Sequence, residues 1–178
     1  FVDISYRSSN SVACLLSNLY PIAFNFKGNS VSSIEGVLQA LKHKDFKTQR
    51  LIFNYSGKDA YHTRAASFLS DWRETGILYF NNEAFNRFDI DYQFLLNDLY
   101  LSAFENPLYA SALKYTGKRE LLHSIGKTDP RETILTTREY IDRLLILRDY
   151  VDSEIRIKFD QLSDDIVKNY NNSRPIRN

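Results

Sequence analysis

Apolar residues recur at helical spacing between Ser32 and Lys42, the segment around which we expect the fold to be organised. Ser32 and Glu35 have the spacing of a capping box, so we expect a helix to begin at Ser32. On its far side, Gly36 and Ala40 are small enough to let another backbone come close. Its apolar stripe consists of Ile34, Leu38 and Leu41.

A polar stripe runs beside the apolar one and consists of Glu35, Gln39 and Lys42. Their spacing of i, i+4 and i+7 places the three side chains on one narrow face of the helix. The stripe is compatible with a capping carboxylate, a solvated amide and a cation near a helix C-terminus. It is equally compatible with a reactive site in which an acid, an amide and an amine lie along one shielded gap.

Upstream of this helix the pattern changes to that of strands. Residues 12–16 form a continuous apolar run, which is typical of a buried strand. Residues 22–26 alternate in polarity with the period of a half-buried strand, and Lys27-Gly28-Asn29 has the composition of a turn. We therefore expect a small antiparallel sheet next to the helix.

Downstream, helical patterns dominate, and the fold class that we predict is α+β. We expect a predominantly helical single domain over residues 1–170, built around a small antiparallel sheet, and a mobile polar tail over residues 171–178. A strand is predicted over 120–125. The helices are predicted over 58–69, from Trp72 after an Asp71 cap, over 89–104, from Pro107 after an Asn106 cap to Gly117, from Thr136 or Thr137 to Tyr150, and over 153–170.

Composition narrows the classes of function. A chain of 178 residues with 43% hydrophobic and 25% charged residues is ordinary for one globular domain. Its net charge of +1 gives no overall field towards nucleic acid or anionic lipid, so phosphate binding would have to come from a local cluster. The longest apolar segments are far short of a membrane span, and the single cysteine, Cys14, fits a reducing compartment. We expect a cytoplasmic protein.

Several common sites have no counterpart in the sequence. There is no phosphate-binding glycine run and no signature of a serine nucleophile. The histidines have no metal-ligand spacing, so we expect neither a metal nor a cofactor. They are His43, His62 and His123.

Nine residues in fixed order surround and include the polar stripe. They are Ser17, Asn18, Tyr20, Pro21, Ser33, Glu35, Gln39, Ala40 and Lys42. The order resembles that of the NADAR (YbiA-like) N-glycosidases, and looser matches extend the resemblance over residues 14–150. Those looser matches include Asp71-Trp72 and Asp129. The chain departs from the family after Asp129, where Pro130 replaces the family's Trp-Gly. The resemblance implies a YbiA-like version of the fold.

The resemblance implies cleavage of a ribose–nitrogen bond, with removal of ADP-ribose from guanine adducts as the leading reaction. Such cleavage builds positive charge on the sugar and negative charge on the leaving base, so it needs a carboxylate and a proton donor. We expect Glu35 to be the central acid or base. The resemblance implies Lys42 as the nucleophile that forms an imine with the opened ribose, and Asp129 as the second carboxylate.

The expected substrate contacts complete this hypothesis. Gln39 would hold a ribose hydroxyl, Trp72 would stack on the base or line the sugar, and Asn18 and Arg64 would bind polar or phosphate groups. The substrate would be a small molecule or an ADP-ribosyl group linked to nucleic acid, without membrane contact. Two alternatives stay open. One is an N-glycosidase acting on ribosylamino-pyrimidine phosphates of riboflavin synthesis, and the other is an ADP-ribose-binding module without catalysis.

Overall fold

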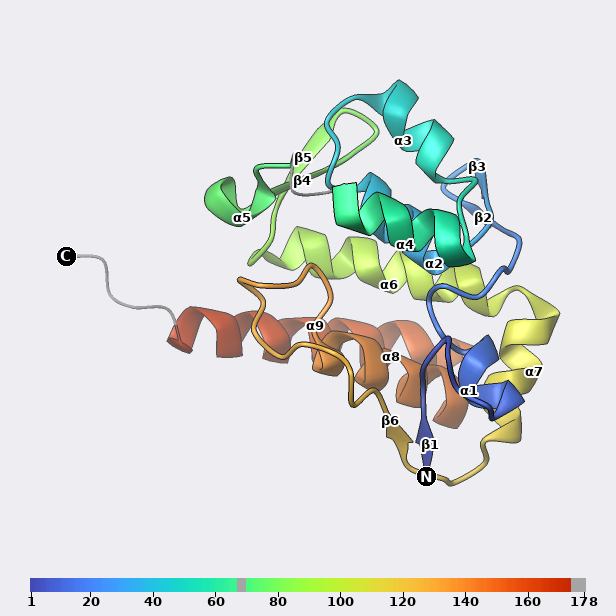
Figure 1. The fold of residues 1–178 in the computed structure, drawn as a ribbon. Coiled ribbons are helices and arrows are strands. Elements are labelled where there is room, and N and C mark those ends of the chain that lie inside the picture. Colours follow the sequence, from blue (N-terminus) through green and yellow to red (C-terminus); the bar gives the residue numbers. More distant parts are fainter. Residues whose placement is uncertain (67–69, 174–178) are drawn as a thin grey trace.

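The computed structural model describes residues 1–66 and 70–173, with side chains described for 1–63 and 70–173 (Figure 1). About 53% of the chain is helical, which confirms the prediction of a predominantly helical α+β domain. The helices in the described part are α1 (Ser11–Leu15), α2 (Ile34–Ala40), α3 (Phe46–Ile52), α4 (Gly57–Ala66), α5 (Trp72–Thr75), α6 (Ile90–Phe104), α7 (Pro107–Tyr115), α8 (Thr137–Asp149) and α9 (Asp152–Ser173).

The strands in the same ranges form three separate pairs rather than one sheet. β2 and β3 are antiparallel, β4 and β5 are antiparallel, and β1 and β6 are parallel. A strand was predicted over 120–125, but β6 is shorter than this range. The strands are β1 (Val2–Asp3), β2 (Phe24–Phe26), β3 (Asn29–Val31), β4 (Ile77–Phe80), β5 (Glu83–Asn86) and β6 (Leu121–Leu122).

The turn predicted at Lys27-Gly28-Asn29 is confirmed, and it joins β2 to β3, a strand that was not predicted. Lys27 and Gly28 both have positive φ, 48° and 86°, as the two central residues of a type I′ hairpin turn require. The same chemistry forms the β4–β5 hairpin, for which no element was predicted. There Asn81 and Asn82 have φ values of 49° and 67°, and asparagine is the residue after glycine that tolerates this conformation best.

The strand predicted over residues 12–16 is wrong, because this segment forms helix α1. Asn10 caps the helix, and its side-chain oxygen accepts a hydrogen bond from the Ala13 amide at 3.0 Å. A short apolar run has no periodicity that separates a buried strand from a single helical turn. The cap was the available signal, because Asn10, two positions before the apolar run begins at Val12, is a preferred helix N-cap.

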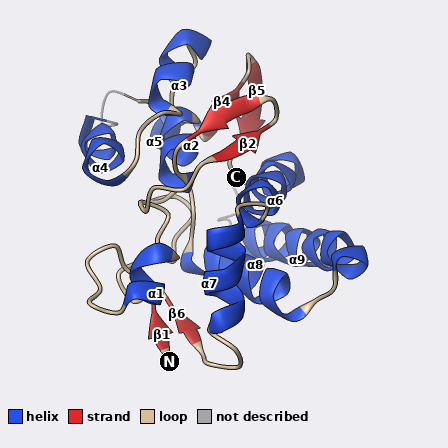
Figure 2. Ribbon diagram, turned by 90° about the vertical axis from the view of Figure 1, so that its right-hand side faces the viewer, coloured by secondary structure: helices blue, strands red, loops and turns tan. Residues whose placement is uncertain are grey.

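Helix α6 lies at the centre of the molecule. It packs against α8 and α9 on one side and against α2 and β2 on the other (Figures 1 and 2). Helix α9 continues to Ser173, so residues 171–173 of the predicted tail are helical, and 174–178 lie outside the described residues. None of the described helices combines the length and apolar character that a bilayer crossing needs.

Helix α2 begins one residue later than predicted. Ser33 is the N-cap, and its Oγ accepts from the Gly36 amide at 2.9 Å and donates to the Tyr55 carbonyl at 2.6 Å. Glu35 is therefore not the partner in a capping box with Ser32. The whole helix is buried, and its small residue Gly36 lies directly against the end of α3, which confirms the predicted close approach of another backbone.

The packing at Gly36 predicts the effect of a methyl group there. A Cβ at this position would lie 2.7 Å from the Tyr55 carbonyl oxygen and 2.9 Å from that of Ile52. Alanine normally stabilises a helix relative to glycine, but overpacking against backbone costs more. We expect Gly36→Ala to lower the free energy of unfolding by about 1–3 kcal/mol. Urea denaturation measures this, with Ser111→Ala on the exposed side of α7 as the control. A stabilised Gly36→Ala would contradict the packing.

Candidate functional site

A cavity of about 1070 Å³ opens between α2, α4 and α5 on one side and the segments before α1 and before α8 on the other. The predicted polar stripe lines it, with Glu35 and Gln39 on α2 and Lys42 in the turn after the helix, which ends at Ala40 rather than at Lys42 as predicted. Their exposed fractions are 7%, 2% and 9%. A solvated polar stripe would be exposed, so burial excludes that interpretation and favours a stripe directed at a ligand.

The amide of Gln39 connects the stripe and leaves one acceptor unused. Its Nε2 donates a hydrogen bond to Glu35 Oε1 at 2.7 Å. Its Oε1 is buried and has no hydrogen-bond partner among the described residues. A buried polar atom of this kind costs free energy unless a ligand or water pairs with it. Gln39 is thus a cavity-lining residue with one buried acceptor that no described residue pairs.

Asn18 lines the cavity and joins α2 to Tyr100 of α6. Its carbonyl accepts from the Glu35 amide at 2.8 Å, and its side-chain Oδ1 accepts from the Tyr100 hydroxyl at 3.0 Å. With Oδ1 occupied, the Asn18 amide nitrogen is the group that can contact a ligand. Burial raises the pKa of Tyr100 and of Tyr140 well above the usual value, and the charge of Glu35 adds to both shifts. Both phenols therefore stay neutral donors.

Trp72 lines the cavity from the start of α5, but it is only 3% exposed. The guanidinium of Arg73 lies over its ring, 5.4 Å from the centroid. Ser70 Oγ, just before this helix, donates to the Lys42 carbonyl at 2.9 Å and ties α5 to the end of α2. Trp72 thus forms part of a packed wall, and the predicted stacking on a base stays a prediction.

Positively charged side chains are concentrated around this cavity. Its lining includes five lysines and arginines but two carboxylates, Glu35 and Glu132, whereas the whole chain has a net charge of +1. Four of the cations are exposed, come from four different segments and make no ion pair within the described part of the chain. They are Arg7, Lys58, Arg73 and Lys127. This is the local cluster that phosphate binding requires.

One predicted site residue, Asp129, lies outside this cavity, and the side chain of another, Arg64, is not among the described ones. Asp129 is not part of its lining, and the Arg131 guanidinium binds it at 2.9 Å. Hydrogen bonds from Arg131 hold the pKa of Asp129 below its usual value. The side chain of Arg64 lies outside the described residues, although its backbone belongs to α4. Within the described ranges, no cluster of His, Cys, Asp and Glu is arranged to hold a metal ion.

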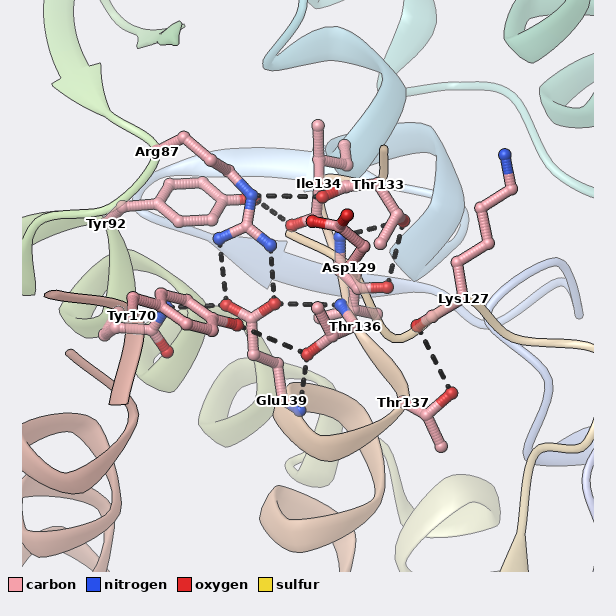
Figure 3. Close-up of polar contacts among 12 residues, drawn as sticks. Arg87, Tyr92, Lys127, Asp129, Thr133, Ile134, Thr136, Thr137, Glu139 and Tyr170 are labelled. Carbon is pink, nitrogen blue, oxygen red and sulfur yellow. Dashed lines mark hydrogen bonds and ion pairs between the residues drawn. The ribbon is translucent and has the colours of Figure 1, made fainter. Parts of the chain in front are cut away.

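A buried ion pair holds the wall formed by residues 132–135 (Figure 3). Arg87 and Glu139 pair through two hydrogen bonds of 3.0 and 2.6 Å. Arg87 Nε also donates to the Thr133 carbonyl at 3.1 Å, and the Tyr92 hydroxyl donates to that of Ile134 at 2.6 Å. The cavity wall is thus fixed to α6 and α8 by residues that sequence reasoning did not assign to the site.

The same ion pair controls the charge of Glu139. Burial alone would raise the pKa of this carboxyl group, but the charge and hydrogen bonds of Arg87 lower it to about 2. A Gln93 hydrogen bond of 2.6 Å to the carboxylate acts in the same direction. Glu139 is therefore ionised at neutral pH, with a structural rather than a chemical role.

Comparison with known proteins gives a family other than the one that the nine-residue motif between Ser17 and Lys42 indicated. The family model described as bacteriophage protein GP30.3 matches residues 10–149. A curated relative from Enterobacteria phage T4, the "Uncharacterized 17.1 kDa protein in Gp30-rIII intergenic region", is 32% identical over 139 residues. These residues cover 77% of this chain and 90% of the T4 protein. No solved structure matches the chain.

These findings overturn the identification with the NADAR family, to which no match was found. Nine positions near α2 carried that identification, whereas the phage family model spans 140 residues, from 10 to 149. Several of the nine have local roles that recur in unrelated proteins. Ser33 caps a helix, and Ala40 fills a fully buried position. The short motif was therefore insufficient, and the YbiA-like version of the fold is withdrawn with it.

Proposed function

We propose a function on the premise that this chain belongs to the bacteriophage protein GP30.3 family. The proposed function is that of a cytoplasmic N-glycosidase that cleaves a ribose–nitrogen bond and removes ADP-ribose from guanine adducts. One observation carries the proposal. An acid, an amide and an amine, each at most 9% exposed, line one wall of a cavity large enough for a nucleotide.

The side chains of Glu35 and Gln39 on α2, and of Lys42 just after it, suit the steps of this reaction. Lys42, shielded from solvent, would attack the ribose C1′ as the bond to the base breaks, and opening of the ring would give an imine. Glu35 would accept the proton that Lys42 has to lose and stabilise positive charge on the sugar. The buried Oε1 of Gln39 would accept a hydrogen bond from a ribose hydroxyl. Water then hydrolyses the imine and releases the sugar.

The exposed cations at the cavity mouth support a substrate that carries phosphate. Arg7 and Lys127 come from the segments before α1 and α8, and Lys58 and Arg73 come from α4 and α5. Cations on several sides of one opening can contact successive phosphate oxygens, as a pyrophosphate would present them. A ribosylamino-pyrimidine monophosphate would use fewer of them, so ADP-ribose is the better match.

A binding module without catalysis is the second candidate, and the position of Asp129 favours it. The hypothesis expected a second carboxylate next to the sugar, but Asp129 is paired with Arg131 outside the cavity lining. Binding of ADP-ribose, seen as a rise in melting temperature, without release of guanine would support this candidate.

Reduction with borohydride tests the proposed intermediate directly. We expect that an ADP-ribosyl guanine oligonucleotide, incubated with the protein and borohydride, leaves an ADP-ribosyl adduct on Lys42, because hydride converts the imine to a stable amine. Peptide mass spectrometry locates the adduct. Lys42→Ala is expected to abolish it, and Lys118→Ala, at an exposed lysine outside the cavity lining, is expected to retain it.

Two results would contradict the imine route. One is an adduct on a lysine other than Lys42, and the other is guanine release by the wild-type protein without any adduct. Absence of both guanine release and adduct would reject the N-glycosidase and leave the binding module, which the melting experiment then tests.

A further inference from the structure

His123 is a cavity residue that the proposed reaction has not yet used. It directly follows β6 and lines the same cavity as Glu35. Its Nδ1 lies 2.9 Å from the Ile4 carbonyl oxygen. Because a carbonyl oxygen can only accept, Nδ1 carries the hydrogen, and Nε2 is the ring nitrogen that remains for a ligand.

The imidazole ring is held in place by close packing. It meets the Tyr140 ring edge-on, with 5.1 Å between the ring centroids and an angle of 82° between the planes. On another side, a Cβ added to Gly126 would lie 2.5 Å from His123 Cδ2, so the backbone itself confines the ring. The next residue, Ser124, donates from its backbone amide to Asp3 at 2.9 Å and anchors the segment to β1. A ring fixed in this way is suited to directed proton transfer.

Tyr140 connects His123 to the polar stripe of α2. It lines the same cavity as His123 and Glu35, and the charge of Glu35 contributes to the raised pKa of its phenol. His123 packs on the same ring. Glu35 and His123 therefore approach one region of the cavity from two different elements, α2 and the segment after β6.

We propose that His123 is the general acid that protonates the leaving base, an assignment that rests on the proposed N-glycosidase function. As Lys42 Nζ forms a bond to C1′, the electron pair of the C1′–N bond passes to the base nitrogen, which takes the proton from Nε2 of the imidazolium. The neutral imidazole regains a proton when water hydrolyses the imine. The sum is substrate plus water giving unmodified guanine in its strand and free ADP-ribose.

The other acids near the cavity suit this step less well. Glu132 is exposed at the mouth, and Asp129 is bound by Arg131. An imidazole ring can both donate and accept a proton, so one histidine can give a proton to the base and regain it in the same turnover. In this proposal, His123 rather than Asp129 is the second acid–base group beside Glu35.

A comparison of leaving groups tests the assignment. We expect His123→Asn to cleave the ADP-ribosyl guanine adduct about 100-fold or more slowly than the wild type. The same variant should cleave 4-nitrophenyl ADP-ribose at nearly the wild-type rate, because nitrophenolate leaves without a proton. Asparagine can still donate to the Ile4 carbonyl, and an unchanged melting temperature checks that the fold is retained.

Rescue provides the second measurement. Added imidazole is expected to restore guanine release by His123→Ala, since a diffusible acid can occupy the vacated space. An equal loss on both substrates without rescue would overturn the acid role of His123 and leave the N-glycosidase intact. A wild-type protein that cleaves neither substrate would overturn both proposals.

Discussion

Glu35→Gln is expected to lower kcat for guanine release by about 10²–10⁴-fold while the melting temperature changes by only a few degrees. The amide cannot take a proton from Lys42 or balance charge on the sugar. It can still accept the hydrogen bond that Gln39 Nε2 donates at 2.7 Å, and it has nearly the same volume as the carboxylate. Single-turnover kinetics and thermal unfolding measure the two effects separately.

The matched control for this variant is Asp129→Asn. It makes the same change from carboxylate to amide at a residue that the resemblance implied to be catalytic, but that the described structure places outside the cavity lining. We expect its activity to match that of the wild type. Equal losses in both variants would return Asp129 to the reaction. A strongly destabilised Glu35→Gln would mean that the carboxylate supports the fold rather than the chemistry.

The sequence was sufficient to predict which polar residues line one side of the candidate site, because the spacing of residues determines which side chains share a helix face. Residues at i, i+4 and i+7 share a face in any helix, so the side chains of Glu35, Gln39 and Lys42 could be grouped without coordinates. The same reasoning predicted the approach of backbone at Gly36. It misplaced the N-cap by one residue, since Ser32 and Ser33 are adjacent and both are good caps.

The rest of the site depends on contacts between residues far apart in the chain, which local patterns do not contain. Arg87 and Glu139 are 52 positions apart, and the hydrogen bond between Ile4 and His123 spans 119. Neither pair has a periodic signature. The family assignment failed for a related reason. The nine matching positions all lie between residues 17 and 42 and are a local signal, whereas the phage family model matches residues 10–149.

Breaking the buried ion pair should have the largest effect on stability. We expect Glu139→Gln to lower the free energy of unfolding by about 3–5 kcal/mol. Both Arg87 and Arg143 are fully buried, and Glu139 is the carboxylate that pairs with Arg87, while Arg143 donates to carbonyl and amide oxygens of Gln93 and Asn97. With glutamine at position 139, the buried guanidinium groups of Arg87 and Arg143 have neutral hydrogen-bond acceptors in place of the carboxylate, so their charge is not compensated there. Urea denaturation at pH 7 measures the loss.

Asp142→Asn on the same helix is the matched control, because its ion pair with Arg138 is exposed and at 3.4 Å. We expect a loss of at most about 1 kcal/mol from it. Similar losses in the two variants would show that the buried pair does not hold the fold. Glu139→Gln should also release the wall near Thr133, which hydrogen exchange of residues 132–135 would detect as faster exchange than in Asp142→Asn.

The dependence of stability on pH tests the same pair without mutation. The pKa of Glu139 is about 2 in the folded protein, below the ordinary value of 4.5, so its stabilising contribution is complete above pH 4.5 and is lost as the pH falls towards 2. The loss is on the order of 3 kcal/mol for a depression of this size. Between pH 5 and pH 2, we expect the free energy of unfolding of the wild type to fall by about 3 kcal/mol more than that of Glu139→Gln. The reason is that the glutamine in the variant binds no proton in this range. Parallel pH profiles would mean that Glu139 is not the group that titrates.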